Sequence, residues 1–438
     1  MTLSLLGSYA LCAVVFLLMI SVLVAAHEYG HYLFARMFNM GVEEFAIGFG
    51  KKPILTWLKK TYVVPIGAGE NPDIHGTASV PGNPSAIALA SALEGSTPDR
   101  LIEKIDTPQG PALRETTNFT IRPWPLGGFV RIKGMLPEED GSETKIPGGF
   151  YSKAPWQRFL VLFAGPLFSV LAGIIILIPV LMFDGKDVFW KAPVLGNVSS
   201  GSPADLAGLR EGDRIVAING ETIHRFYRAI ELVRASEGKS LRFEITRNGE
   251  ANRIISVTPK MDTKATPLVQ PNLEATGELA KTYKMGVSPV VRVEKLSFPA
   301  ATVAAVGIPV DAVNGLLRLF RKPSEFSDTV GGPATMVTAT ARAVQIGIWK
   351  VLWLASVLSI SVGIFNLLPT PPLDGGQMVM ALAEMIRGGK RLSIRSQAIA
   401  SGIGMTFVLA LVMSAMFVDF KRFTTPAPKD SSTTSQKK

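Results

Sequence analysis

The chain has 438 residues, of which 47% are hydrophobic and 18% are charged. Soluble proteins carry about 25% charged residues, so this composition argues against a fully soluble enzyme or a disordered chain and indicates a membrane protein. Basic residues in cytoplasmic loops beside anionic lipid explain the net charge of +10, so we expect no nucleic-acid partner. The single cysteine, Cys12, excludes an internal disulfide framework.

Four stretches without Asp, Glu, Lys or Arg are long enough to cross a bilayer, which takes about 20 apolar residues. They cover residues 1–27, 159–183, 351–373 and 396–418. The first could be a cleaved signal peptide, but it has no basic start, and its apolar run exceeds the usual length of about 7–15 residues. We therefore expect it to be a retained span.

The third stretch has an unusual end, because Asn366, Pro369, Pro371 and Pro372 follow one another closely. A regular helix cannot continue through these prolines, so the backbone should break there and line a cavity or pack against protein. Four basic residues between positions 387 and 395 place the next loop in the cytoplasm. With four spans, residues 184–350 and both termini are then expected outside, although Lys421 and Arg422 favour the opposite orientation.

The segments between the spans differ in character. Residues 61–118 are rich in Gly, Pro, Ala, Ser and Thr without a sustained period, which predicts a loop insertion with His75 in solvent. Alternating apolar and basic residues at the end of Ile121–Gly134 predict a short strand after a glycine turn, or else a surface hairpin. Residues 296–322 suit an amphipathic helix, either at the outer membrane face or packed on the preceding module.

Residues 193–259 have the pattern of a compact α/β module. A capped short helix is predicted at Ser202-Pro203, a strand from Arg214 to Ile218, and a turn at Asn219-Gly220. This signature resembles a PDZ domain, a fold that binds extended peptides by strand addition. The alternative is a plug or spacer without a ligand. His224 is expected on its surface.

The sequence His27-Glu28-Tyr29-Gly30-His31 carries the clearest chemical signal. Two histidines four residues apart share one face of a helix, so both imidazoles can hold one Zn²⁺, and the intervening glutamate can reach a metal-bound water as a general base. Placing ionisable groups within the membrane costs free energy, so their presence in a span indicates a function. A role as an anchor at the membrane interface would explain one histidine, but it would not explain His27, Glu28 and His31 together.

A catalytic zinc site usually has three protein ligands, so one ligand remains to be found. Asp374 is the candidate, because it ends the broken third stretch beside Gly375 and Gly376, on the side where the first span also ends. Proline prevents a helix there, which leaves the carboxylate free to turn toward a metal. The alternative is that Asp374 caps a helix over residues 377–386.

The motifs also occur in the order of a known family. HEYGH, Glu44-Phe-Ala-Ile-Gly-Phe-Gly50, Pro125-Leu-Gly-Gly-Phe-Val130, Ala164-Gly-Pro166, the PDZ-like module and NLLPTPPLDGG together resemble the site-two protease family, and more narrowly its regulator of sigma-E protease branch. The resemblance covers nearly the whole chain. Two features depart from it: one PDZ module stands where some members have two, and the insertion 61–118 has no counterpart.

The resemblance implies a role for each matching residue. His27, His31 and Asp374 would be the zinc ligands, Glu28 the catalytic base, and Asn366 a substrate-positioning residue. The strand around Gly127, Gly128 and Phe129 would hold the substrate in an extended form. These three residues would bind the substrate, because a helical substrate must unwind before water can attack it.

The fold implied is a polytopic α-helical membrane protein with four transmembrane helices, a short membrane-associated β segment and an inserted α/β PDZ domain. Its expected parts, in chain order, are a first transmembrane helix with HEYGH (1–38), a cytoplasmic or re-entrant segment (39–155), a second transmembrane helix (156–183), the PDZ domain (193–260), an amphipathic membrane-associated segment (261–345), a third transmembrane region with LDGG (346–376), a fourth transmembrane helix (396–418) and a disordered tail (424–438).

The function implied is that of an intramembrane zinc metalloendopeptidase acting on a transmembrane protein substrate in the lipid bilayer, in regulated intramembrane proteolysis. An anti-sigma factor or a cleaved signal peptide is the expected substrate. The expected place is the bacterial inner membrane, with the PDZ domain in the periplasm. A catalytically inactive PDZ-bearing membrane adaptor is the alternative, although all three ligands and the glutamate are present. A transporter would also use broken spans, but no inverted repeat is evident.

Overall fold

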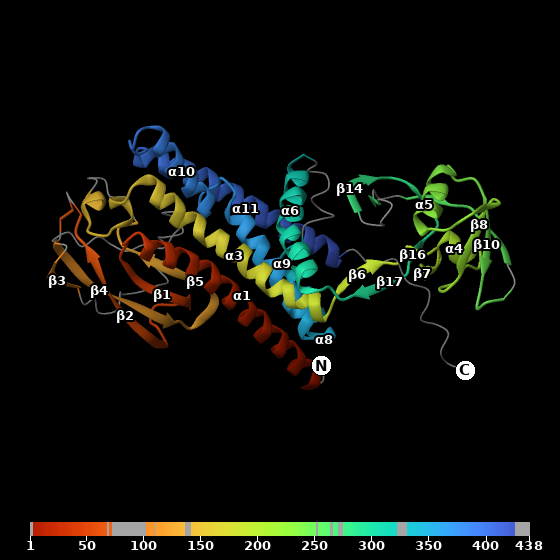
Figure 1. The fold of residues 1–438 in the computed structure, drawn as a ribbon, viewed down its shortest axis with the longest axis horizontal. Coiled ribbons are helices and arrows are strands. Elements are labelled where there is room, and N and C mark those ends of the chain that lie inside the picture. The colour runs from red at the N-terminus through yellow and green to blue at the C-terminus, as the bar shows by residue number, and fades with distance from the viewer. Residues whose placement is uncertain are drawn as a thin grey trace. The chain divides into compact units, whose positions relative to one another are not determined.

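The computed structural model describes residues 3–67, 70–71, 102–108, 110–135, 142–250, 253–262, 266–269, 275–321 and 331–424. The chain divides into two compact units. The first contains residues 1–180 and 299–425, and the second contains residues 181–298. Figure 1 labels the helices and strands of both units.

The first unit is mainly helical. Its helices are α1 (Leu3–Met37), α3 (Pro155–Phe183), α6 (Phe298–Arg321), α8 (Pro333–Ile346), α9 (Ile348–Asn366), α10 (Asp374–Ile386) and α11 (Ile394–Thr424). As expected, α9 ends at Asn366, just before the prolines, and a second helix starts at Asp374. Two short 3₁₀ helices, η1 (Ser142–Lys145) and η2 (Phe150–Ser152), precede α3.

Five of the described helices are long and apolar enough to cross a membrane: α1, α3, α6, α9 and α11. Many of their apolar side chains face outward, including Leu18, Ile175 and Ile403, which are 65%, 66% and 69% exposed. A helix that is apolar on every side needs lipid or protein around it, so the chain is a multi-pass membrane protein. The expected number of four spans is not confirmed, because α6 is a fifth candidate. In Figure 1, α6 stands at a steep angle to α1, α3 and α9.

A five-stranded sheet follows α1. Its strands are β1 (Val42–Phe49), β2 (Leu55–Pro65), β3 (Ile102–Thr107), β4 (Gly110–Ile121) and β5 (Trp124–Ile132). The order is β2-β4-β1-β5, with β3 also paired to β4. Strand β5 lies at the edge, antiparallel to β1, and packs against α1. The strand predicted at Phe129–Ile132 is confirmed, although β5 begins earlier and contains the glycines that were expected to form a turn.

The prediction of a loop over residues 61–118 is wrong in three places. Residues 61–65, 102–107 and 110–118 belong to the strands β2, β3 and β4. The polar residues of β4 obscured the strand pattern, because they are buried and paired. Thr117 Oγ1 donates to the Val42 carbonyl at 2.5 Å, and Lys133 Nζ lies 2.5 Å from Glu115 Oε1. His75 and the tail from residue 425 lie outside the described residues.

The second unit is an α/β module. It contains β6 (Lys186–Phe189), β7 (Leu195–Val198), α4 (Pro203–Leu206), β8 (Arg214–Ile218), β9 (Glu221–Thr222), α5 (Phe226–Ala235), β10 (Leu241–Thr246), β11 (Arg253–Val257), β12 (Lys260–Met261), β13 (Thr266–Val269), β14 (Ala275–Ala280), β15 (Tyr283–Lys284), β16 (Val287–Pro289) and β17 (Val291–Glu294). The largest sheet has the order β11-β10-β8-β9.

Several local predictions for this module are confirmed. Ser202 caps α4 by accepting a hydrogen bond from the Asp205 amide, β8 spans Arg214–Ile218, and His224 is exposed. The module extends beyond the expected end at residue 260, however. Met285 belongs to the same buried core as Leu195, and β16 pairs with β7.

Candidate metal centre

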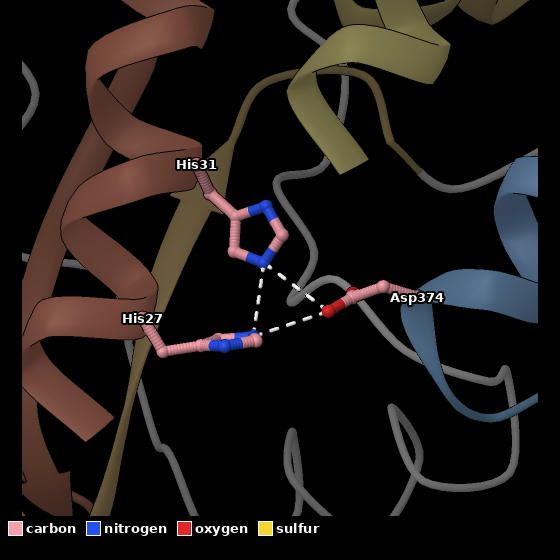
Figure 2. Close-up of side chains that lie close together, drawn as sticks. All are labelled: His27, His31 and Asp374. Atoms are coloured by element: carbon pink, nitrogen blue, oxygen red, sulfur yellow. Dashed lines mark hydrogen bonds and ion pairs between the residues drawn. The ribbon is translucent and has the colours of Figure 1, made fainter. Parts of the chain in front are cut away.

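Helix α1 carries two buried histidines one turn apart. His27 and His31 are 7% and 1% exposed. Because α1 continues without a break to Met37, both side chains leave the same face of the helix. Their Nε2 atoms are 3.3 Å apart. Figure 2 shows the two rings side by side, with a dashed line between these atoms.

Asp374 reaches this pair from α10. Its Oδ2 atom lies 3.1 Å from His27 Nε2 and 3.5 Å from His31 Nε2. The N-cap of α10 is Leu373, and Asp374 lies in the first turn, so the capping alternative is wrong. A side chain at Gly376 would overlap the backbone of Pro371, which explains why glycine follows the aspartate where α10 folds back on the preceding turn.

Helix α3 supplies the second hydrogen-bond partner of each ring. His31 Nδ1 lies 2.8 Å from the Val161 carbonyl oxygen, and His27 Nδ1 lies 2.8 Å from Ser169 Oγ. Between these two, a Cβ added to Gly165 would overlap His31 Nε2 and lie 2.9 Å from His27 Nε2. The glycine therefore leaves space where the two Nε2 atoms converge.

The residues fit a zinc ion. The three ligand atoms all lie within 4.8 Å of one another, and all three residues are buried. With each Nδ1 bonded to α3, each Nε2 is directed at the shared space. Two imidazoles and one carboxylate are a donor set used by catalytic zinc sites, which keep a further position for water.

Glu28 lies beside this cluster. In the described part of the chain, its Oε2 atom is buried and has no hydrogen-bond partner. The backbone amide of Val130 on β5 lies near the Glu28 carboxylate. A buried carboxylate oxygen without a partner next to a candidate metal site is available to take up a proton.

Strand β5 brings the predicted substrate-binding residues to the same place. Ser21 Oγ of α1 donates to the Pro125 carbonyl at 2.8 Å, which holds the start of β5 against the helix. A Cβ on Gly128 would lie 2.6 Å from the Ala46 oxygen and 3.4 Å from Val24 Cγ1, so a larger residue there would push β5 away from β1 and α1. Gly127 lies next to it in the strand.

The side chain of Phe129 is not exposed, as a substrate-binding side chain would have to be. Its ring is fully buried, with the guanidinium groups of Arg122 and Arg131 5.1 Å and 5.2 Å from its centre. Any contribution of Phe129 to substrate binding would therefore come from its backbone. Asn366 is the last residue of α9 and is half-buried, and it is not part of the three-residue cluster.

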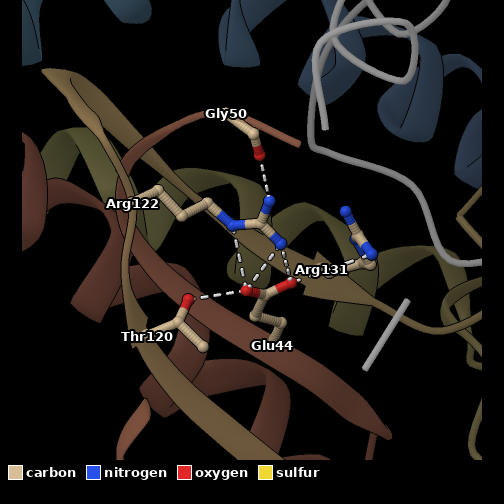
Figure 3. Close-up of polar contacts among 5 residues, drawn as sticks. All are labelled: Glu44, Gly50, Thr120, Arg122 and Arg131. Carbon is tan, nitrogen blue, oxygen red and sulfur yellow. Dashed lines mark hydrogen bonds and ion pairs between the residues drawn. The ribbon is translucent and has the colours of Figure 1, made fainter. Parts of the chain in front are cut away.

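A buried ionic network supports β5 from within the sheet (Figure 3). Glu44 of β1 accepts hydrogen bonds from Arg122 Nη2 at 2.8 Å and from Thr120 Oγ1 at 2.6 Å, and it lies 3.7 Å from Arg131 Nη1. Arg122 also donates to the Gly50 carbonyl. This network joins β1, β4 and β5.

Sequence reasoning missed Ser169, Gly165 and the Val161 carbonyl. The motif Ala164-Gly-Pro166 contributes to the family resemblance alone, and nothing in the sequence places α3 beside α1. A glycine within an apolar span, with a hydroxyl residue four positions later, was the available signal.

A set of apolar helices with a buried His, His, Asp cluster and an adjacent carboxylate that has one unpartnered oxygen defines a membrane metalloprotease. The sequence model of peptidase family M50 matches residues 15–81 and 105–411, so the chain belongs to this family. It is 28% identical to "Probable protease eep" of Enterococcus faecalis, over 94% of this chain and 99% of that protein. It is 29% identical to zinc metalloprotease RasP of Bacillus licheniformis, over 93% and 98%.

Proposed function

We propose that this protein is an intramembrane zinc metalloprotease that hydrolyses a peptide bond within or near the transmembrane segment of a membrane protein. The observation that carries the proposal is the convergence of His27, His31 and Asp374 beside the unpartnered oxygen of Glu28. The relative RasP is named a zinc metalloprotease, which supports the choice of metal.

His27, His31 and Asp374 would hold the zinc ion through Nε2, Nε2 and Oδ2. When bound there, zinc supplies Lewis acidity toward the peptide carbonyl and lowers the pKa of water. Glu28 Oε2 takes the proton of the attacking water and later delivers it to the nitrogen of the leaving amine.

The edge of β5 would bind the substrate. A peptide bond within a helix is shielded, so the substrate must unwind before hydrolysis, and an unwound segment in lipid needs partners for its backbone groups. An edge strand provides them by strand addition. β5 lies at the sheet edge, and its Val130 amide lies at Glu28, so a paired substrate would pass close to the base.

The second unit would be a PDZ module that screens substrates. A groove of about 460 Å³ opens between α5 and β15–β16, with Phe226, Ile230, Met285 and Val287 among its lining residues. Strand β16 pairs with β7 and also lines this groove, which is the arrangement needed for a peptide to add as a strand. We place this module in the periplasm and the protein in the bacterial inner membrane, in regulated proteolysis of a signalling protein such as an anti-sigma factor.

The decisive experiment combines metal analysis with cleavage. The purified full-length protein should contain about one zinc per chain and cut a model transmembrane substrate in detergent or liposomes. A chelator should stop the cleavage, and added zinc should restore it. A protein that binds a transmembrane segment but never cuts it, with zinc present, would be the inactive adaptor instead.

A further inference from the structure

One face of α3 covers the ligand cluster. Val161, Gly165 and Ser169 follow one another at intervals of four residues and lie on one side of the helix. His27 and His31 have the same interval on α1, so the two helices meet in register: Val161 contacts His31, and Ser169 contacts His27. The two contacts differ in chemistry, however.

The proton of His31 is fixed by its partner. A carbonyl oxygen is solely an acceptor, so His31 Nδ1 must carry the hydrogen that it donates to Val161. In the neutral ring, the lone pair is then on Nε2, which is the atom directed at Asp374. Backbone geometry therefore sets the metal-binding tautomer of His31.

The proton of His27 depends on a side chain. A serine hydroxyl is both a donor and an acceptor, so Ser169 selects the useful tautomer of His27 when it accepts from Nδ1. Ser169 is fully buried. Its carbonyl accepts a 2.7 Å hydrogen bond from Ser359 Oγ of α9, and a Cβ on Gly363 would lie 3.1 Å from the Ser169 Cβ. The serine is thus held tightly between α9 and His27.

We propose that Ser169 is the positioning residue of the metal site: its hydroxyl accepts the Nδ1–H hydrogen bond of His27 and so fixes the ring tautomer and orientation that present Nε2 to the metal. The proposal rests on the proposed function, because it requires the zinc site. Removing an outer partner of a metal-binding histidine lowers metal affinity by about 10- to 100-fold, and we expect an effect of this size.

The test measures zinc affinity of the full-length protein by competition with a chelator. Ser169→Ala should bind zinc about 10- to 100-fold more weakly than the wild type. Ser356→Ala is the matched control, because Ser356 is also buried and donates from α9 to the Gly173 carbonyl of α3 at 2.8 Å, but it does not contact a histidine. Its zinc affinity should stay close to that of the wild type.

A second pair of variants separates the hydroxyl from packing. Ser169→Thr and Ser169→Val introduce side chains of equal shape that differ in the hydroxyl, so they carry the test if Ser169→Ala does not fold. The threonine variant should bind zinc more tightly than the valine variant. The absorption spectrum of the cobalt-loaded protein should also change in Ser169→Val, because it reports ligand geometry.

The outcomes are distinct. Equal zinc affinity and equal cobalt spectra for the threonine and valine variants would overturn the role of Ser169, and so would equal losses in Ser169→Ala and Ser356→Ala, which would indicate helix packing. If the wild-type protein itself binds no zinc through His27 and His31, the proposed function fails along with the inference.

Discussion

In the proposed chemistry, some residues bind the metal ion and another transfers protons. Glu28 is the residue that transfers protons. Glu28→Gln should keep zinc, because both histidines stay in place, but should lower cleavage by at least about 10²- to 10⁴-fold, the usual contribution of a general base. Zinc content and the initial rate on a model membrane substrate are measured on the same preparation. Wild-type turnover by this variant would remove Glu28 from the mechanism.

Asp374 belongs to the binding side. Asp374→Asn should lose most of its zinc and its activity together, because a neutral amide is a poor ligand for the ion. Asp419→Asn is a matched control: Asp419 is another buried aspartate, and it accepts from the Ala334 and Thr335 amides at 2.8 and 3.1 Å at the start of α8. The control should be less stable but keep its zinc. Full zinc content in Asp374→Asn would require a different third ligand.

Site residues could be predicted from the sequence where they are close together in the chain. His27 and His31 could be found because the geometry of one helix brings them together. Asp374 was found through the proline-interrupted end of the third stretch, but its 3.1 Å contact with His27 comes from tertiary packing. Ser169 and Gly165 were not found, because their roles exist only where α3 packs against α1.

Among the elements, α6 poses the clearest question, since its length and composition suit a span. The contact between His27 and Asp374 argues against α6 as a membrane span. It requires the end of α9 to lie near the second half of α1, so both helices should run in the same direction across the membrane. Helix α3 runs back between them, and a crossing by α6 would reverse α9. We therefore expect α6 to lie along the outer membrane face, as its pattern suggested.

Cysteine labelling can test this placement, because Cys12 is the single native cysteine. In a Cys12→Ser background, Ser297→Cys and Arg321→Cys mark the two ends of α6. Both should react with a membrane-impermeant reagent added from the outer side of intact cells. Labelling of one end from outside and the other solely after permeabilisation would make α6 a fifth span.

The sheet depends on its buried ionic network. Glu44→Ala would leave Arg122 and Arg131 buried without their shared carboxylate, and breaking a buried pair in this way costs about 3–5 kcal/mol. Glu103→Ala is the control, because its pair with Arg114 is exposed at the same sheet and such pairs contribute about 0–1 kcal/mol. Unfolding in detergent should show a large loss for the first variant alone. Equal stability of the two would contradict the supporting role of the network.

Apolar sequence patterns located many elements well. Long uncharged runs located α1, α3, α9 and α11, and a short apolar run located β8 in the second unit. Apolar patterns failed for β4, however, for a physical reason: Glu115, Thr117 and Asn118 are buried there. A buried polar residue needs a partner, and partners such as Lys133 come from distant parts of the chain, so the sequence alone offered no sign of the strand.

For the molecule as a whole, we propose separate tasks for the two units. All candidate ligands and the candidate base belong to the first unit, whereas the second has a core of its own around Leu195, Phe243 and Met285. Its two ends are also adjacent: Phe189 of β6 pairs with Val291 of β17. Paired residues lie about 4.5–5.5 Å apart between Cα atoms, so residues 190–290 can be excised and replaced by a short glycine linker.

The excised protein should bind zinc like the wild type and should cut substrates with large external domains that the intact protein rejects, because we expect the second unit to act as a filter. The measurement compares a short and a bulky membrane substrate in both proteins. An excised protein that folds and binds zinc but cuts neither substrate would make the second unit part of the active enzyme.

Ile230→Asp separates two ways in which the filter can work. Ile230 lines the groove between α5 and β16, so an aspartate there should block an apolar peptide residue while leaving the bulk of the unit unchanged. If size alone excludes substrates, this variant should reject the bulky substrate as the wild type does. Cleavage of the bulky substrate by Ile230→Asp would show instead that occupation of the groove controls access.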